Sequence, residues 1–196
     1  IKKGVFGLSE APRLWWLRIR KDLVETGWEE LSVMAAVFVL KDRAGTLCGL
    51  LVLHVDDGLT CGEGKYYIDA LEALKKRAPL NKWSKGEIVF TGRKITQFDD
   101  MTIQVEQHEY LKTLKHVSMM PKRRKEEEAE LTFQEQKDLR NLIGKLAWPA
   151  RKTCPHLAFM VSDLTQKFST AKAKDLNQAN LLVKTATRLM ELSVLS

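Results

Sequence analysis

The chain has 196 residues, of which 44% are hydrophobic and 29% are charged, so it can bury a core in one large domain or two small ones. It contains no run of about 18 apolar residues and no cleavable signal, so we expect no transmembrane helix. The formal net charge of +7 favours a polyanionic partner. Cys48, Cys61 and Cys154 show no paired spacing, which indicates reduced thiols in an intracellular protein. Because the first residue is not Met, we expect an excerpt from a longer protein.

Residues 10–26 are predicted to form an amphipathic helix. Ser9 is suited to cap its N-terminus, and Gly27 follows its C-terminus. Trp15, Ile19 and Leu23 recur every four residues and form one apolar stripe, so we expect this helix to pack on a sheet. The free N–H groups and the helix dipole at its N-terminus favour a phosphate there.

Two apolar strands are predicted at residues 33–40 and 46–54, joined by a polar turn. The second strand runs into Asp56-Asp57-Gly58, a pattern typical of a tight hairpin turn. Adjacent carboxylates repel each other unless a cation neutralises them, and Mg²⁺ prefers oxygen ligands. The pattern therefore predicts a hairpin that presents Asp56 and Asp57 as metal ligands, although a solvated acidic turn has the same pattern. Because side chains alternate along a strand, we expect His54 and Asp56 to face the same side.

The middle of the chain predicts a helix at residues 62–79 and two strands at residues 87–95 and 101–105. The turn between these strands carries a second acidic pair, Asp99-Asp100. Its flanks are polar and differ from those of the first pair, so we interpret it as a solvated turn.

The C-terminal part is predicted to be helical. A short helix at residues 107–116 precedes an exposed mixed-charge linker at residues 119–128, whose basic half could contact phosphates or act as a nuclear address. Thr132 and Glu135 form a capping box, and Pro149 and Pro155 are expected to break the helical pattern. Further helices are predicted at residues 156–168 and 175–192. Cys154 and His156 are too few for a zinc site.

Two motifs in order resemble a known family. The block at residues 5–16, Val-Phe-Gly-Leu-Ser-Glu-Ala-Pro-Arg-Leu-Trp-Trp, is followed by the hairpin His54-Val55-Asp56-Asp57. Together they resemble the palm of a copia-type retrotransposon reverse transcriptase, which carries Leu-Tyr-Gly-Leu-Lys-Gln-Ala-Pro-Arg-x-Trp-Tyr and then Tyr-Val-Asp-Asp. Residues 107–115 and 142–159 resemble later segments of the same family.

The resemblance implies an α+β fold, with a partial reverse-transcriptase palm in which an antiparallel sheet packs on helices. It assigns residues 1–117 to this palm, residues 118–131 to a charged linker and residues 132–196 to a helical thumb-like region. The implied location is intracellular, in a cytoplasmic particle or the nucleus.

The implied activity is RNA-directed DNA polymerisation, a nucleotidyl transfer that uses two Mg²⁺ ions. The resemblance assigns Asp56 and Asp57 as catalytic residues and metal ligands. It assigns Phe6, Gly7, His54 and Lys85 to nucleotide or template binding, with His54 in place of the family's Tyr. Ser9 and Glu10 replace the family's Lys and Gln.

The implied partners are an RNA or DNA primer–template, deoxynucleoside triphosphates and the remainder of the Pol polyprotein, namely the fingers, RNase H and integrase; no membrane is implied. The family supplies a further aspartate from a strand before the Gly7 block. We expect that strand and the fingers to lie outside these residues, which would leave the fragment inactive alone. The alternatives are a non-enzymatic nucleic-acid-binding protein and a decayed transposon remnant; a small-molecule metal enzyme lacks a His/Glu ligand set.

Overall fold

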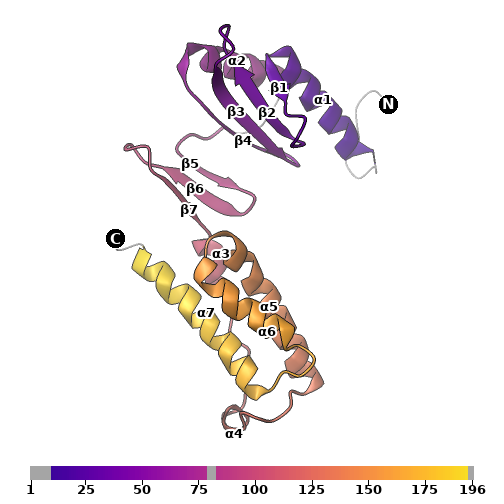
Figure 1. Cartoon of the computed structure of the whole chain (residues 1–196), viewed down its shortest axis with the longest axis vertical. Coiled ribbons are helices and arrows are strands. Elements are labelled where there is room, and N and C mark those ends of the chain that lie inside the picture. The colour runs from indigo at the N-terminus through magenta and orange to yellow at the C-terminus, as the bar shows by residue number, and fades with distance from the viewer. Residues whose placement is uncertain (1–9, 79–82, 194–196) are drawn as a thin grey trace. The chain divides into compact units, whose positions relative to one another are not determined.

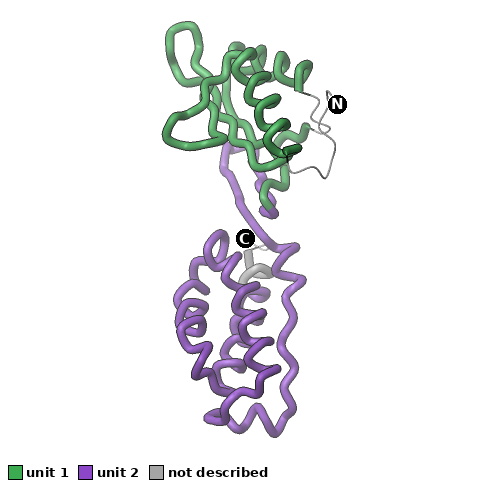
Figure 2. Tube along the Cα trace, turned by 90° about the vertical axis from the view of Figure 1, so that its right-hand side faces the viewer, with its two compact units in different colours: residues 1–91 green, residues 92–196 purple. Residues whose placement is uncertain are grey.

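The structure is a computed structural model that describes residues 10–78 and 83–193. The chain packs into two compact units, residues 1–91 and 92–196, which we describe separately (Figure 2). Helices and antiparallel strands occur together, so the predicted α+β class is confirmed. No helix among the described residues has the length and apolar character needed to cross a membrane.

The first unit contains a four-stranded antiparallel sheet and two helices (Figure 1). The sheet has the order β1-β2-β3-β4, so each strand pairs with the next one along the chain. The elements of this unit are α1 (Ala11–Glu25), β1 (Trp28–Glu30), β2 (Val37–Lys41), β3 (Leu47–His54), β4 (Asp57–Gly62), α2 (Gly64–Arg77) and β5 (Glu87–Phe90).

The core of the first unit joins both helices to the sheet. Ile19 and Leu23 of the predicted stripe are buried, and Trp15 packs against the same core, so the stripe is confirmed. Helix α1 has Glu10 as its N-cap, without a side-chain cap bond, and Ser9 lies outside the described residues. The remaining large core side chains come from the strands and α2: Trp28, Phe38, Leu40, Leu51, Leu53, Tyr67 and Leu74.

The strand predicted at residues 33–40 is wrong in its first half. Strand β2 begins only at Val37, and the side chain of Val33 is 83% exposed. The chain instead forms β1, which the sequence analysis did not predict, and then turns through Ala36, whose φ is +63°. The Leu31 N–H donates to the Val37 carbonyl at 2.8 Å and closes this turn. Apolar residues in an exposed turn thus gave the same pattern as a buried strand.

Two glycines leave space for an aromatic ring over the β3–β4 pair. Gly49 and Gly62 are register partners, and Tyr67 of α2 packs over them. A Cβ on Gly49 would lie 2.8 Å from Tyr67 Cδ2, and one on Gly62 would lie 2.5 Å from the Cys48 carbonyl oxygen. The Tyr67 hydroxyl is 3.2 Å from Thr60 Oγ1. Because neither glycine position accepts a side chain, the ring fixes where α2 sits on the sheet.

The second unit begins with a strand pair and continues with helices (Figure 1). Its elements are β6 (Arg93–Gln97), β7 (Ile103–Glu106), α3 (His108–Lys112), α4 (Pro121–Lys125), α5 (Phe133–Lys152), the short 3₁₀ helix η1 (Pro155–Leu157), α6 (Ala158–Gln166) and α7 (Ala173–Ser193). The strand predicted at residues 87–95 is interrupted, because Thr91 and Gly92 have φ of +49° and +72°. Helices α3, α5, α6 and α7 share one core.

The polar features of this unit agree with the prediction in part. The capping box is confirmed, since the Thr132 side chain accepts from the Glu135 N–H and the Glu135 carboxylate accepts from the Thr132 N–H. The Asp99-Asp100 turn is exposed, as expected. The linker predicted at residues 119–128 is not a continuous loop: it contains α4, and Arg123 of this helix forms an ion pair with Glu135 at 3.0 Å.

Pro149 does not end the helix in which it occurs, contrary to the prediction. Helix α5 continues to Lys152, with Pro149 buried inside it. Proline has no N–H, so the carbonyl of Lys145, four residues earlier, loses its helical donor. The Tyr110 hydroxyl of α3 donates to that carbonyl at 3.0 Å, and its ring packs edge-on against Trp148 at 4.4 Å between centroids. A side chain from another helix thus replaces the bond that proline removes.

We expect Tyr110→Phe to destabilise the protein by about 1–2 kcal/mol, because the Lys145 carbonyl would lose its donor. In a Pro149→Ala background, the alanine N–H can satisfy this carbonyl, so the same change should have a much smaller effect. Urea unfolding of the four proteins in this double-mutant cycle measures the coupling between the two residues. Equal effects in the two backgrounds would show that the hydroxyl does not replace the missing helical bond.

Candidate active site at the acidic hairpin

The predicted hairpin is present, and β3 and β4 form its two arms. The pairing runs without a register shift from Gly49–Gly62 to His54–Asp57. Leu51 and Leu53 of β3 are buried in the core, so the strand is anchored up to the residue before His54. Only Val55 and Asp56 lie between the strands, so the hairpin has a two-residue loop. The sheet therefore supports both carboxylates directly.

The loop is strained at Val55. This residue has a φ of +53°, which a β-branched side chain rarely adopts, and its side chain is 69% exposed. Two-residue hairpins need positive φ at the loop because that conformation matches the twist of the strands, and glycine or asparagine usually supplies it. A non-glycine residue in this region stores about 1–3 kcal/mol.

His54 and Asp57 form the closing pair of the hairpin. They are direct register partners, so their side chains leave the sheet on the same face. The expectation that His54 and Asp56 face the same side was wrong in its basis. Strand β3 ends at His54 and Asp56 belongs to the loop, so the alternation of side chains along a strand does not reach Asp56. The His54 ring also lies edge-on to Phe90 of β5, with 6.4 Å between ring centroids. Phe90 was not predicted to be near the site, because nothing in a strand's sequence identifies a tertiary partner.

Neither carboxylate of the hairpin is engaged by another side chain in the part of the chain that the structure describes. Asp56 and Asp57 are exposed and have no hydrogen-bond or ion-pair partner among the described residues. Adjacent carboxylates that no protein group neutralises favour a bound cation, and their oxygens suit a hard ion such as Mg²⁺. In the described parts of the chain, however, no third His, Cys, Asp or Glu joins them in a group that could hold a metal ion.

The structure does not bring all the predicted site residues together. Phe6 and Gly7 lie outside the described residues. Lys85 is exposed and lies two residues before β5, outside the helices and strands. The part of the predicted site that the structure assembles therefore consists of His54, Asp56 and Asp57. The roles assigned to Phe6, Gly7 and Lys85 stay predictions.

We expect Val55→Gly to stabilise the first unit by about 0.5–1 kcal/mol, because relief of the strained φ outweighs the greater entropy of glycine in the unfolded chain. The matched control is Val89→Gly, since Val89 is 72% exposed in β5 and has no positive φ. This control should destabilise the protein, because glycine weakens a strand. The free energy of unfolding in urea measures both changes; a loss of stability in both variants would contradict the strain.

In comparisons with known proteins, no family model, no curated protein and no solved structure matches the chain.

Proposed function

We propose that this chain is the palm-onward part of a copia-type retrotransposon reverse transcriptase, and that its acidic hairpin contributes metal-binding carboxylates to RNA-directed DNA synthesis. The observation that carries the proposal is the hairpin itself. It holds two adjacent, exposed carboxylates, without side-chain partners in the described part of the chain, at the end of an antiparallel sheet packed on helices. The block at residues 5–16, which precedes it in the order typical of the family, supports the same conclusion.

Asp56 and Asp57 are the residues that would hold Mg²⁺ in this reaction. Their side-chain oxygens have no partner among the described residues, and the hairpin is anchored by the buried Leu51 and Leu53 of β3, so the donor set fits the ion. Two bound Mg²⁺ ions supply the activation of the primer 3′ oxygen and the stabilisation of the pyrophosphate leaving group. His54, on the same face as Asp57, would orient the primer end or the nucleotide beside these carboxylates. Its ring lies edge-on to Phe90.

Two carboxylates on one hairpin do not complete such a site. A two-metal centre needs ligands from more than one element, and the described residues offer no third candidate next to Asp56 and Asp57. The resembled family supplies another aspartate from a strand that precedes the Gly7 block. We therefore propose that these residues bind the metal weakly alone and act only when that strand is supplied.

We expect Mn²⁺, used as a paramagnetic substitute for Mg²⁺, to broaden the backbone NMR signals of residues 54–58 first. The double variant Asp56→Asn, Asp57→Asn should weaken this effect at least about tenfold, because it removes both anionic ligands. The double variant Asp99→Asn, Asp100→Asn is the matched control and should leave it unchanged. Equal broadening at the two acidic turns in the native chain would mean that the first turn is not a metal site.

Primer extension tests the polymerase itself. These 196 residues alone should not extend a primer, whereas a fusion to the fingers and first palm strand of an active copia-type enzyme should do so. In this fusion, Asp56→Asn should lower the rate by at least about 100-fold, because it removes charge stabilisation in the transition state. Asp100→Asn should not change the rate. Extension that survives Asp56→Asn would contradict the assignment.

A non-enzymatic nucleic-acid-binding protein is the second candidate, and the basic charge favours it. The net charge is +7, and Lys122, Arg124 and Lys125 of α4 are exposed and have no ion-pair partner among the described residues. This candidate predicts binding without extension, even in the fusion. A polymerase predicts both.

We expect the chain to bind a labelled RNA–DNA hybrid weakly, without sequence preference and with an affinity that falls steeply with salt. The physical reason is the release of counterions from phosphates when lysine and arginine side chains approach them. Fluorescence anisotropy at several salt concentrations measures the slope, and Lys122→Ala with Lys125→Ala should reduce it by up to about two units of log K per log salt. Affinity that does not change with salt would rule out phosphate contacts as its source.

A further inference from the structure

Helix α1 flanks the sheet of the first unit, and its face opposite the core stripe is exposed (Figure 1). Three aliphatic side chains on this face are about half exposed: Leu14 at 48%, Leu17 at 49% and Val24 at 52%. Lys21 completes their spacing, in which the second residue follows the first by three positions and both recur after seven. This is the a and d pattern of a coiled coil, and it places all four side chains along one line of the helix. We call these four residues the α1 seam.

The burial of the whole helix agrees with this heptad assignment. With Leu14 as an a position, every a, d, e and g position in residues 13–25 is exposed, and every b, c and f position is buried or half-buried. On an ordinary surface helix, the face opposite the core is polar. Helix α1 instead presents aliphatic residues there, as expected of a helix that packs on its own sheet by one face and on a partner helix by the other.

Arginines border the α1 seam on both sides. The e and g positions that flank it are Arg13, Arg18, Arg20 and Glu25. In coiled coils, charges at these positions form the ion pairs between helices that select the partner. Arg13 has no hydrogen-bond or ion-pair partner in the described part of the chain. Three of the four flanking residues are cations, so they favour a partner that brings carboxylates.

The other two arginines have partners but keep donors for a further carboxylate. Arg18 donates from Nε to the buried Asp22 at 2.8 Å, and Arg20 donates from Nε to Glu30. A guanidinium has five N–H donors, so the two Nη groups of each arginine remain. The side chains of Arg18 and Arg20 are 68% and 50% exposed, which leaves these groups accessible.

The one acid that flanks the α1 seam is already paired within the first unit. Glu25 accepts from Arg77 of α2, and its other oxygen lies 3.7 Å from Lys21 Nζ. This distance is too long for a hydrogen bond, so Lys21 keeps its donors for a partner. A hollow of about 500 Å³ beside these residues is also lined by Lys76, which is exposed and has no partner among the described residues. The surroundings of the seam are therefore positive.

Two other kinds of occupant fit the α1 seam less well. A second copy of α1 would bring arginines at e and g against each other, and like charges at such short separation repel. A nucleic-acid backbone would pair with the cations but would leave the aliphatic side chains exposed. An acidic helix with an apolar stripe satisfies both the cations and the aliphatic residues.

We propose that the α1 seam binds an acidic amphipathic helix of a partner protein. Aliphatic residues of that helix pack on Leu14, Leu17 and Val24, and one of its carboxylates pairs with Lys21. Because α1 is already folded on its sheet, binding does not require it to nucleate a helix. The inference does not rest on the polymerase proposal, since none of these residues belongs to the acidic hairpin.

The test uses the full 196-residue chain and three probes. The first is a peptide of three heptads with Leu at a and d, Glu at e and g, and one Glu at the a position that faces Lys21. The second is a scrambled peptide of the same composition, and the third is a single-stranded oligonucleotide. The patterned peptide should shift the backbone NMR signals of residues 13–25 with a Kd of about 1–100 μM, and the scrambled peptide should bind at least about tenfold more weakly.

Several outcomes of this titration would overturn the proposal. Equal binding of the two peptides would mean that charge alone attracts them. Tighter binding of the oligonucleotide at the same residues would make a nucleic acid the occupant. Concentration-dependent dimerisation of the chain that Leu17→Gln abolishes would make a second copy the occupant. No shift with the patterned peptide at millimolar concentration would mean that the seam binds no such helix.

Variants with matched controls locate the binding surface. Leu17→Gln should weaken binding of the patterned peptide at least about tenfold because it removes apolar contact area, whereas Leu181→Gln, at a leucine that is 52% exposed on α7, should not. Lys21→Glu should also weaken it, and Lys65→Gln in α2 should not. A peptide with Lys in place of the Glu that faces position 21 should restore binding to the Lys21→Glu variant, which an unfolded variant would not show. An unchanged Kd in Leu17→Gln, or no rescue by the charge-swapped peptide, would contradict the proposal.

Discussion

The packing of the Tyr67 ring over Gly49 and Gly62, which are partners in neighbouring strands, determines the position of the acidic hairpin. The ring of Tyr67 occupies the space that side chains at Gly49 and Gly62 would need, so α2 fits on the β3–β4 pair only where those glycines meet. Side chains repeat every two residues along a strand, so a slip by one residue would exchange the buried and the exposed faces of β3. With the Gly49–Gly62 pair fixed, the uninterrupted register leads directly to His54 and Asp57. The position of the carboxylates is therefore set by a packing contact at the opposite end of the same two strands.

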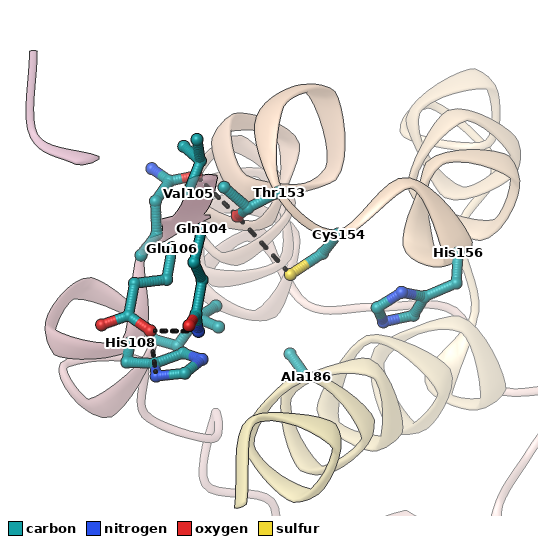
Figure 3. A pocket seen from close by; sticks show the side chains of 10 residues that line it. Gln104, Val105, Glu106, His108, Thr153, Cys154, His156 and Ala186 are labelled. Carbon is teal, nitrogen blue, oxygen red and sulfur yellow. Dashed lines mark hydrogen bonds and ion pairs between the residues drawn. The ribbon is translucent and has the colours of Figure 1, made fainter. Parts of the chain in front are cut away.

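A similar compensation organises the second unit. Pro149 removes a helical hydrogen bond from α5, and Tyr110 supplies a replacement from α3. Because Gln107 is the N-cap of that same short helix, the bond that completes α5 also holds α3 beside a cavity that Gln107 lines (Figure 3). The Gln107 carbonyl accepts from the Leu111 N–H at 3.0 Å, so its backbone is tied into the helix while its side chain faces Thr153. In the first unit, Tyr67 fills the space that two glycines leave. In the second unit, Tyr110 donates to a carbonyl that a proline leaves unpaired.

Features that depend on local pattern were predictable from the sequence, and features that depend on tertiary partners were not. The apolar stripe of α1, the acidic hairpin and the Thr132 capping box each involve residues a few positions apart, so their signals lie in short windows. Strand β1 carries two glutamates in three residues, and exposed Val33 resembles a core residue, so neither could be recognised from hydrophobicity. The proline inside α5 could not be recognised as tolerable for the same reason, because the Tyr110 donor lies 35 residues before the Lys145 carbonyl that it satisfies. For the candidate site, the sequence predicted the two carboxylates but neither the His54–Asp57 pairing nor the contact with Phe90.

A strained residue with positive φ occurs both at the acidic hairpin and at the Asp99-Asp100 turn. The two turns differ in the hydrogen bonds of their carboxylates. Met101, beside Asp100, also has a positive φ, of +68°, and is 72% exposed. There, however, the Asp100 carboxylate accepts from the Thr102 N–H at 2.9 Å. Hydrogen bonding by the Thr102 side chain, and then by its N–H, lowers the pKa of the Asp100 carboxyl. That acid stabilises its own turn, which is the ordinary use of aspartate in turns. The carboxylates of Asp56 and Asp57 make no such bond to any described residue, although they repel each other and follow a strained valine. Because neither carboxylate has a side-chain partner within residues 10–78 and 83–193, we propose that a ligand neutralises them both.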